Sequence, residues 1–326
     1  MRFSAVLGLY YFAYFAYVGA YSPYITLYFK DLGMTAAEIG LLYSIPQVMR
    51  IFGPGAWGHL ADSSGNPQSI LRAAALCSCA VFGGVYFGTS FAWLFMVMVV
   101  VHFFTSAQMP LVEAITLDHV RARPGDYGRI RVWGSVGFIA SVLGLGYVLD
   151  AMPVVWVLHV TVALLALVAL VSFLIPAPAA QVYEGGRASL RTQLGLPAVR
   201  LFLAASALNA FAHAALYTFL SIYLAQLGYS KSVIGWMWSA GVLIEIAVFQ
   251  CMPQLMRCFR LETLFFSTFI VCALRFVLIA WTAQWWQALL FAQLLHAFTF
   301  AIYHASAVGL ARRHFGEGNQ ARGQAI

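Results

Sequence analysis

The chain has 326 residues, of which 62% are hydrophobic and only 9% are charged, and its formal net charge is +7. Soluble domains carry about 25% charged residues, so this composition excludes an ordinary water-soluble domain and places the chain in a lipid bilayer. The positive charge does not indicate a nucleic-acid partner, because the basic residues stand in short gaps between apolar runs and form no polar basic face. The five cysteines fit neither a disulfide framework nor a metal site.

The apolar runs predict membrane-spanning helices. A helix needs about 20 apolar residues to cross a bilayer, and runs of that length recur along the chain, the first being too long for a cleavable signal peptide. Short gaps between them make neighbouring helices antiparallel. Ten helices are predicted near residues 4–29, 38–59, 69–88, 91–118, 130–150, 153–176, 198–226, 232–256, 262–281 and 284–311.

The longest gap divides the chain. Residues 177–197 are rich in proline, glycine and polar residues, which is typical of a surface linker. We therefore expect an N-terminal six-helix bundle at 1–176, a cytoplasmic linker at 177–197, and a C-terminal part at 198–326 that holds four helices.

The positions of the basic residues predict the topology. Most arginines fall at the chain ends or in the even-numbered gaps, whereas Lys30 and Lys231 lie in odd-numbered gaps. By the positive-inside rule the N-terminus is cytoplasmic, and we expect a multi-pass protein of the cytoplasmic (inner) membrane. Arg50 and Arg275 are different, because they lie well inside apolar helices.

The chain matches itself at an offset of about 195 residues. Residues 27–50 align with 222–245, and residues 101–107 align with 295–301, which pairs His102 with His296. Both copies begin on the same side of the membrane, so the repeats are parallel, as are the two halves of a major facilitator transporter. Twice the offset predicts an intact chain of about 390 residues. We therefore expect two further C-terminal helices, without which the chain would transport poorly.

Motifs near the second helix resemble the same superfamily. Thr35 and Glu38 predict a capping box that opens this helix. At its end, "GHLADSSG" resembles the major facilitator loop motif through Gly58, Asp62 and Gly65, although the basic residues of that motif are absent. The resemblance implies a gating or structural role, in which Gly58 allows close helix approach and Asp62 caps a helix or binds an arginine.

The hairpin from Pro110 to Ser135 carries the most specific resemblance. "PLVEA" followed by "DYGRIRVWGSVGF" is similar to the helix 4–5 hairpin of the lactose permease, nucleoside symporter and phenylpropionate permease branch. This resemblance implies that Glu113 and Arg131 bind substrate, although a buried pair that only fixes the hairpin is the alternative. Asp126 and Arg129 are predicted to be interfacial, with a loop-fixing role.

The second half adds three polar residues inside apolar helices, namely Glu245, Arg275 and His296. Lactose permease carries glutamate, arginine and histidine on the same helices, which implies substrate binding by Arg275 and proton coupling by Glu245 and His296. The glutamate that follows this histidine by one turn in lactose permease is replaced here by Thr299. Glu245 or Glu113 is therefore expected to carry the proton.

A tyrosine stripe marks the first helix. Its members recur every three or four positions and so share one face. Such a stripe, with Trp236, suggests a cavity wall that stacks on a ring or a sugar, or else a packing stripe. Arg50 aligns with Glu245 in the repeat and is expected to have a gating or structural role, in which it meets Asp62 or a loop carboxylate. His102 is expected to be a satisfied packing histidine. The stripe consists of Tyr10, Tyr14, Tyr17, Tyr21 and Tyr24.

Together these features predict an all-α membrane protein with the major facilitator fold, ten of twelve expected helices being present. The expected function is secondary active transport by alternating access, as proton-coupled symport of an aromatic acid of the 3-phenylpropionate type. A sugar or nucleoside substrate is the alternative, and a non-transporting sensor or a membrane enzyme is the alternative class. The expected partners are the solute, protons and the bilayer; we expect a monomer, with no metal and no cofactor.

Overall fold

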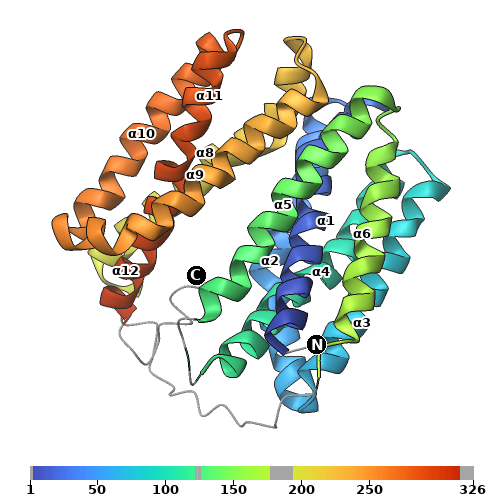
Figure 1. The fold of residues 1–326 in the computed structure, drawn as a ribbon, viewed down its shortest axis with the longest axis horizontal. Helices are drawn as coiled ribbons and strands as arrows, with labels where there is room; N and C mark the ends of the chain where they lie inside the picture. Colours follow the sequence, from blue (N-terminus) through green and yellow to red (C-terminus); the bar gives the residue numbers. More distant parts are fainter. Residues whose placement is uncertain (1–2, 122, 124–125, 177–193, 316–326) are drawn as a thin grey trace. The chain divides into compact units, whose positions relative to one another are not determined.

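The computed structural model describes residues 3–121, 123, 126–176 and 194–315, apart from the side chains of Asp62 and Phe315. Within these ranges the chain forms ten helical segments, which correspond to the ten predicted ones (Figure 1). The first repeat contains α1 (Phe3–Asp31), α2 (Ala36–Ser64), α3 (Pro67–Phe82) with the 3-10 turn η1 (Gly83–Phe87), α4 (Phe91–His119), α5 (Asp126–Ala151) and α6 (Trp156–Ser172). The second contains α8 (Pro197–Gln226), α9 (Lys231–Cys258), α10 (Leu261–Thr282), and a last segment made of α11 (Trp286–Leu294), the π-helical turn η2 (Phe298–Ile302) and α12 (Tyr303–Phe315).

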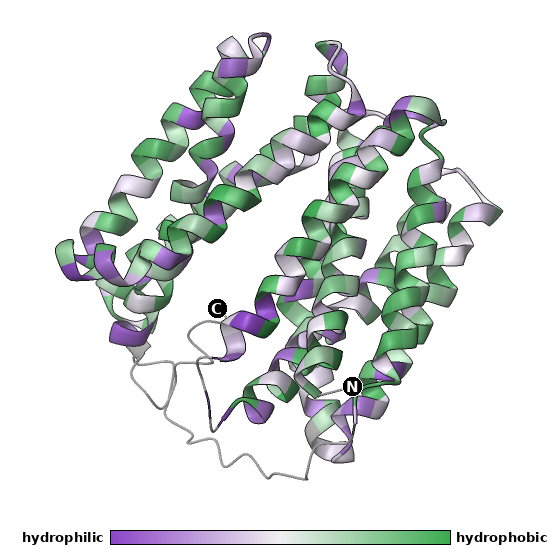
Figure 2. Cartoon of the chain, viewed as in Figure 1, coloured by the Kyte–Doolittle hydropathy of each residue, from purple (hydrophilic) through white to green (hydrophobic). Residues whose placement is uncertain are grey.

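Most of these segments are long and apolar enough to cross a membrane. Eight of them meet this test among the described residues, and Figure 2 colours much of the length of these helices as hydrophobic. The other two are α6, which has only 17 residues, and α2, whose 29 residues include many polar ones. A long membrane helix with polar residues at its centre is typical of a cavity wall.

Local signals set the two ends of α2, and the signal at its first end was predicted. The hydroxyl of Thr35 accepts a hydrogen bond from the Glu38 N–H at 3.3 Å, while the Glu38 carboxylate accepts one from the Thr35 N–H at 2.8 Å. This is the expected capping box. At the other end Gly65 adopts a left-handed conformation with φ 62° and closes the helix. Its role is therefore that of a C-cap.

The repeat is visible in the backbone. Gly33 follows α1 with φ 80°, and the equivalent Gly228 follows α8 with φ 87°. A left-handed turn of this kind favours glycine. Both repeats therefore end their first helix with the same conformation, which supports the sequence alignment between them.

Small residues bring α1 and α5 close together, and α1 also packs on α6 (Figure 1). A Cβ atom added at Gly19 would stand 2.6 Å from the carbonyl oxygen of Phe138, and one added at Gly137 would collide with the carbonyl oxygen of Phe12. Glycines at helix contacts allow backbones to approach in membranes. This contact fixes the face of α1 that carries the tyrosine stripe.

Packing divides the chain into two compact units. The first comprises Met1–Val182, Tyr217–Ala225 and Ser230–Gly235, and the second comprises Tyr183–Leu216, Gln226–Tyr229 and Trp236–Ile326. Residues 177–193 of the predicted linker lie outside the described residues. The first unit thus includes the end of α8 and the first turn of α9, which the simple division at the linker did not predict.

Candidate functional site

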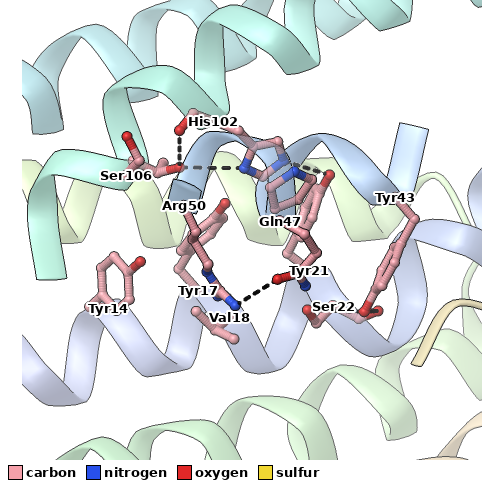
Figure 3. Close-up of a pocket in the computed structure, with 12 residues that line it drawn as sticks. Tyr14, Tyr17, Val18, Tyr21, Ser22, Tyr43, Gln47, Arg50, His102 and Ser106 are labelled. Carbon is pink, nitrogen blue, oxygen red and sulfur yellow. Dashed lines mark hydrogen bonds between the residues drawn. The ribbon is translucent and has the colours of Figure 1, made fainter. Parts of the chain in front are cut away.

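The first unit contains a hollow that is lined only by α1, α2 and α4 (Figure 3). Counted to its mouth and including the open solvent there, its empty space is about 540 Å³. Four tyrosines supply most of its aromatic surface, and its lining also includes one arginine and one histidine. The lining residues are Tyr14, Tyr17, Val18, Tyr21, Ser22, Tyr43, Pro46, Gln47, Arg50, His102, Thr105 and Ser106.

The middle of the tyrosine stripe forms one wall of this cavity. Tyr14, Tyr17 and Tyr21 are nearly buried and follow one another along α1, with ring centroids 6.0 Å and 5.8 Å apart. The two ends of the stripe bind protein atoms instead. Tyr10 donates a hydrogen bond to Gln108 at 3.3 Å, and Tyr24 donates one to the carbonyl oxygen of Val142 at 2.8 Å.

His102 faces the same cavity from α4. Its Nε2 is joined to the Tyr21 hydroxyl by a hydrogen bond of 3.0 Å, and its Nδ1 is joined to the Thr105 hydroxyl at 3.4 Å. The expectation that His102 only packs in the interior therefore needs a correction, because both of its hydrogen-bonding partners line the cavity. It is a buried polar group that is satisfied at the cavity wall.

Arg50 reaches the cavity from α2 (Figure 3). Its guanidinium donates a hydrogen bond to the side-chain oxygen of Gln47, one turn earlier, at 3.2 Å. Pro46 also lines the cavity, and a proline inside a helix removes one backbone hydrogen bond and bends the helix. Within the described residues no carboxylate lies within 4.0 Å of Arg50. The Asp62 side chain, one partner expected for it, lies outside them.

The predicted hairpin pair is close but not in contact. Arg131 lies over the ring of Phe15, 4.2 Å from its centroid, and over that of Tyr11 at 5.4 Å. Glu113 is half-buried on α4 and is attracted electrostatically by Arg131, and Tyr127 interacts with both side chains. Among the described residues the two charges form no ion pair within 4.0 Å. Substrate binding by this pair stays a prediction.

The second unit brings the predicted coupling residues together. The His296 Nε2 lies 3.9 Å from the Glu245 carboxylate, and both side chains are largely buried. Gly241, one turn before Glu245, makes room for the imidazole, since a Cβ atom there would stand 3.0 Å from His296. The η2 turn follows directly, and π-turns in helices often occur at functional sites.

Arg275 lies in the interior of the second unit, with 2% of its surface exposed. It donates hydrogen bonds to the carbonyl oxygen of Ala292 at 3.1 Å, to Gln293 at 3.1 Å and to Thr299 at 3.3 Å. These bonds join α10 to the irregular last segment. The geometry supports a bracing role, and the role in substrate binding implied by the resemblance stays a prediction.

The remaining predicted residues lie away from the cavity. Trp236 belongs to the second unit and is half-exposed. Asp126 and Arg129 form an exposed pair at 3.4 Å in the first turn of α5, as expected of a loop-fixing pair. Gly58 does not show the expected close approach, because among the described residues a Cβ atom there would meet nothing within 4 Å.

Sequence reasoning therefore missed part of the site. Tyr43 and Gln47 of α2 were not predicted, and Arg50 was assigned to gating. One signal could have identified α2: its helical spacing places Tyr43, Gln47 and Arg50 on one face. A second signal is the repeat itself, which aligns Arg50 with Glu245.

Comparisons with known proteins agree with this architecture. The sequence pattern of the MFS_1 like family, MFS standing for major facilitator superfamily, matches residues 5–326. The chain belongs to this family. It is a multi-pass membrane protein and a secondary transporter of small solutes, not an enzyme.

Two relatives and one solved structure are similar to this chain over most of its length. A probable 3-phenylpropionic acid transporter of Escherichia coli is 33% identical over 93% of this chain and 80% of that relative. A putative nucleoside transporter, YegT, of the same species is 25% identical over 89% of this chain and 71% of the relative. The crystal structure of the nucleoside transporter NupG has a TM-score of 0.84 at 17% identity, covering 100% of this chain and 87% of that structure, which shows a shared fold.

Proposed function

We propose that this protein carries a small aromatic acid of the 3-phenylpropionate kind across the cytoplasmic membrane. The cavity of the first unit is the observation that carries the proposal, because it combines a row of neighbouring tyrosine rings with an arginine. Tyrosine faces suit an aryl ring, and a guanidinium suits a carboxylate. The relative described as a probable 3-phenylpropionic acid transporter supports the same substrate class.

The proposed mechanism is proton-coupled symport by alternating access, with the N-terminus in the cytoplasm. Glu245 and His296 support the coupling, because a largely buried carboxylate and imidazole 3.9 Å apart could exchange a proton after a small approach to hydrogen-bond distance or through one bridging water. Transport of an anion together with a proton would also lower the net charge that crosses the bilayer.

A nucleoside or sugar is the second candidate substrate. The cavity also offers hydroxyl groups from Ser22, Thr105 and Ser106, which suit a ligand rich in hydroxyls. The relative described as a putative nucleoside transporter supports this alternative.

Uptake into vesicles that contain the full-length protein would test the proposal. Labelled 3-phenylpropionate, uridine and maltose would be offered with and without an inward proton gradient, beside protein-free vesicles. We expect saturable uptake of 3-phenylpropionate that the gradient accelerates. Saturable uptake of uridine or maltose alone would overturn the aromatic-acid assignment, and binding without uptake would indicate a sensor.

A further inference from the structure

Equivalent places in the two repeats carry opposite charges beside equivalent histidines. In the first repeat Arg50 and His102 line one cavity. In the second repeat Glu245 lies 3.9 Å from His296. The offset of about 195 residues relates Arg50 to Glu245 and His102 to His296. The same helix positions therefore build a cationic site in one unit and an acid–base pair in the other.

We propose that Arg50 is the residue that recognises the substrate carboxylate, while the equivalent place in the second repeat, Glu245, serves proton coupling. Charge recognition and proton coupling are thereby divided between the two repeats. This inference rests on the proposed function for its substrate class. It names a binding residue that the family resemblance did not indicate.

The surroundings of Arg50 suit an anion. A charged side chain within the membrane interior is costly unless it meets an opposite charge. The cavity has no carboxylate among its lining residues, and within the described residues Arg50 makes no ion pair. Its hydrogen bond to Gln47 uses one guanidinium nitrogen and fixes the orientation of the group. The guanidinium offers five N–H donors in a planar fork that fits a carboxylate.

Unlike Arg50, Arg131 and Arg275 do not line the cavity. The guanidinium of Arg131 covers the rings of Phe15 and Tyr11, and that of Arg275 is buried against three acceptors of its own unit. Arg50 is the arginine of the three that lines the hollow. The tyrosine rings lie on the same hollow, so an aryl group and its carboxylate would both find partners there.

The test measures charge preference at the cavity with two ligand pairs. The full-length protein in lipid nanodiscs would be titrated with 3-phenylpropionate and its neutral amide, and with hexanoate and its amide. We expect the wild type to prefer the aryl acid to the aryl amide, and Arg50→Gln to reduce that preference about 10-fold to 100-fold while binding of the amide persists. Arg129→Gln is the matched control, since Arg129 lies in an exposed pair outside the cavity.

A second variant keeps the arginine in place. Gln47→Glu has nearly the same shape and puts a carboxylate where the amide oxygen now lies, 3.2 Å from the guanidinium. This internal carboxylate would compete with the ligand, so we expect the same loss of acid preference. If Arg50→Gln fails to fold, Gln47→Glu still tests whether Arg50 recognises the substrate carboxylate.

The outcomes separate the inference from the proposed function. If Arg50→Gln and Gln47→Glu both keep the preference for 3-phenylpropionate over its amide, the inference would be overturned and the proposed function would stand. If the wild type binds hexanoate as tightly as 3-phenylpropionate, and the variants lose the preference for acid over amide, the role of Arg50 would be supported and the aromatic substrate would be overturned. A wild type that does not distinguish acids from amides would overturn both.

Discussion

The carboxylate of Asp150, at the end of α5, accepts hydrogen bonds from the backbone N–H of Lys231 at 2.6 Å and of Ser232 at 3.2 Å. These are the first residues of α9, whose N–H groups have no partner within the helix. Tyr24 adds a second link, because its hydroxyl donates to the carbonyl oxygens of Val142 at 2.8 Å and of Lys231 at 3.1 Å. A side chain of the first repeat thus caps a helix of the second.

Alternating access requires the two repeats to separate at one face and then at the other, so we expect this cap to break during transport. Asp150→Ala removes a helix cap worth about 1 kcal/mol. We predict that hydrogen exchange at the amides of residues 231–234 becomes about fivefold faster. Exchange measured by mass spectrometry would check this, with Asp126→Ala, which breaks only a local pair, as the control. Unchanged hydrogen exchange at these amides in Asp150→Ala would show that the Asp150 carboxylate does not stabilise the first turn of α9.

The close contact between α1 and α5 gives a prediction about stability. Gly137→Ala places a methyl group against the carbonyl oxygen of Phe12, whereas Gly144→Ala on the same helix meets nothing within 4 Å among the described residues. Overpacking of this kind costs about 1–3 kcal/mol. We expect a lower thermal unfolding midpoint in detergent for Gly137→Ala and no decrease for Gly144→Ala. Equal midpoints would mean that the helices do not pack this closely.

The stacked position of Arg131 predicts a structural effect. Arg131→Gln loses contacts with the faces of Phe15 and Tyr11, which are worth about 0.5–2 kcal/mol. We expect a lower unfolding midpoint and only partial recovery in Arg131→Lys, because lysine has no planar group to stack.

Arg131→Gln also distinguishes the role of Arg131 in substrate binding from that of Arg50. We expect Arg131→Gln to keep the preference for 3-phenylpropionate over its amide. Loss of that preference in this variant, but not in Arg50→Gln, would instead support the hairpin role implied by the lactose permease resemblance.

The helices could be predicted from the sequence because long apolar runs have few alternatives to a membrane helix. The repeat could also be predicted from the sequence, because paired residues such as Gly33 and Gly228 recur at a constant offset. In the structure both glycines adopt the same left-handed conformation. The coupling roles of Glu245 and His296 were implied by family resemblance and stay a prediction, and the structure places the two side chains 3.9 Å apart.

The cavity could not be predicted in the same way, because it depends on which faces of α1, α2 and α4 meet. The helix α4 is largely apolar around its whole circumference, so hydrophobic periodicity does not identify its inward face. Arg50 and Arg275 both lie well inside apolar helices in the sequence, and the packing around each distinguishes a cavity residue from a buried bracing residue. The capping of α9 by Asp150 joins residues 81 positions apart and depends on the packed structure.

The central claim, proton-coupled transport of an aromatic acid with Glu245 in the coupling pair, is tested most directly by recording proton movement. De-energised vesicles with the full-length protein would be suspended in weak buffer, and external pH would be followed while 3-phenylpropionate is added. Protein-free vesicles correct for passive entry of the undissociated acid, and Glu38→Gln, which changes only an exposed capping box, is the matched variant.

The account predicts alkalinisation beyond the passive signal for the wild type and for Glu38→Gln. Glu245→Gln should lose this signal while it still exchanges labelled substrate. Alkalinisation that persists unchanged in Glu245→Gln, or saturable substrate entry without proton movement in the wild type, would contradict the account.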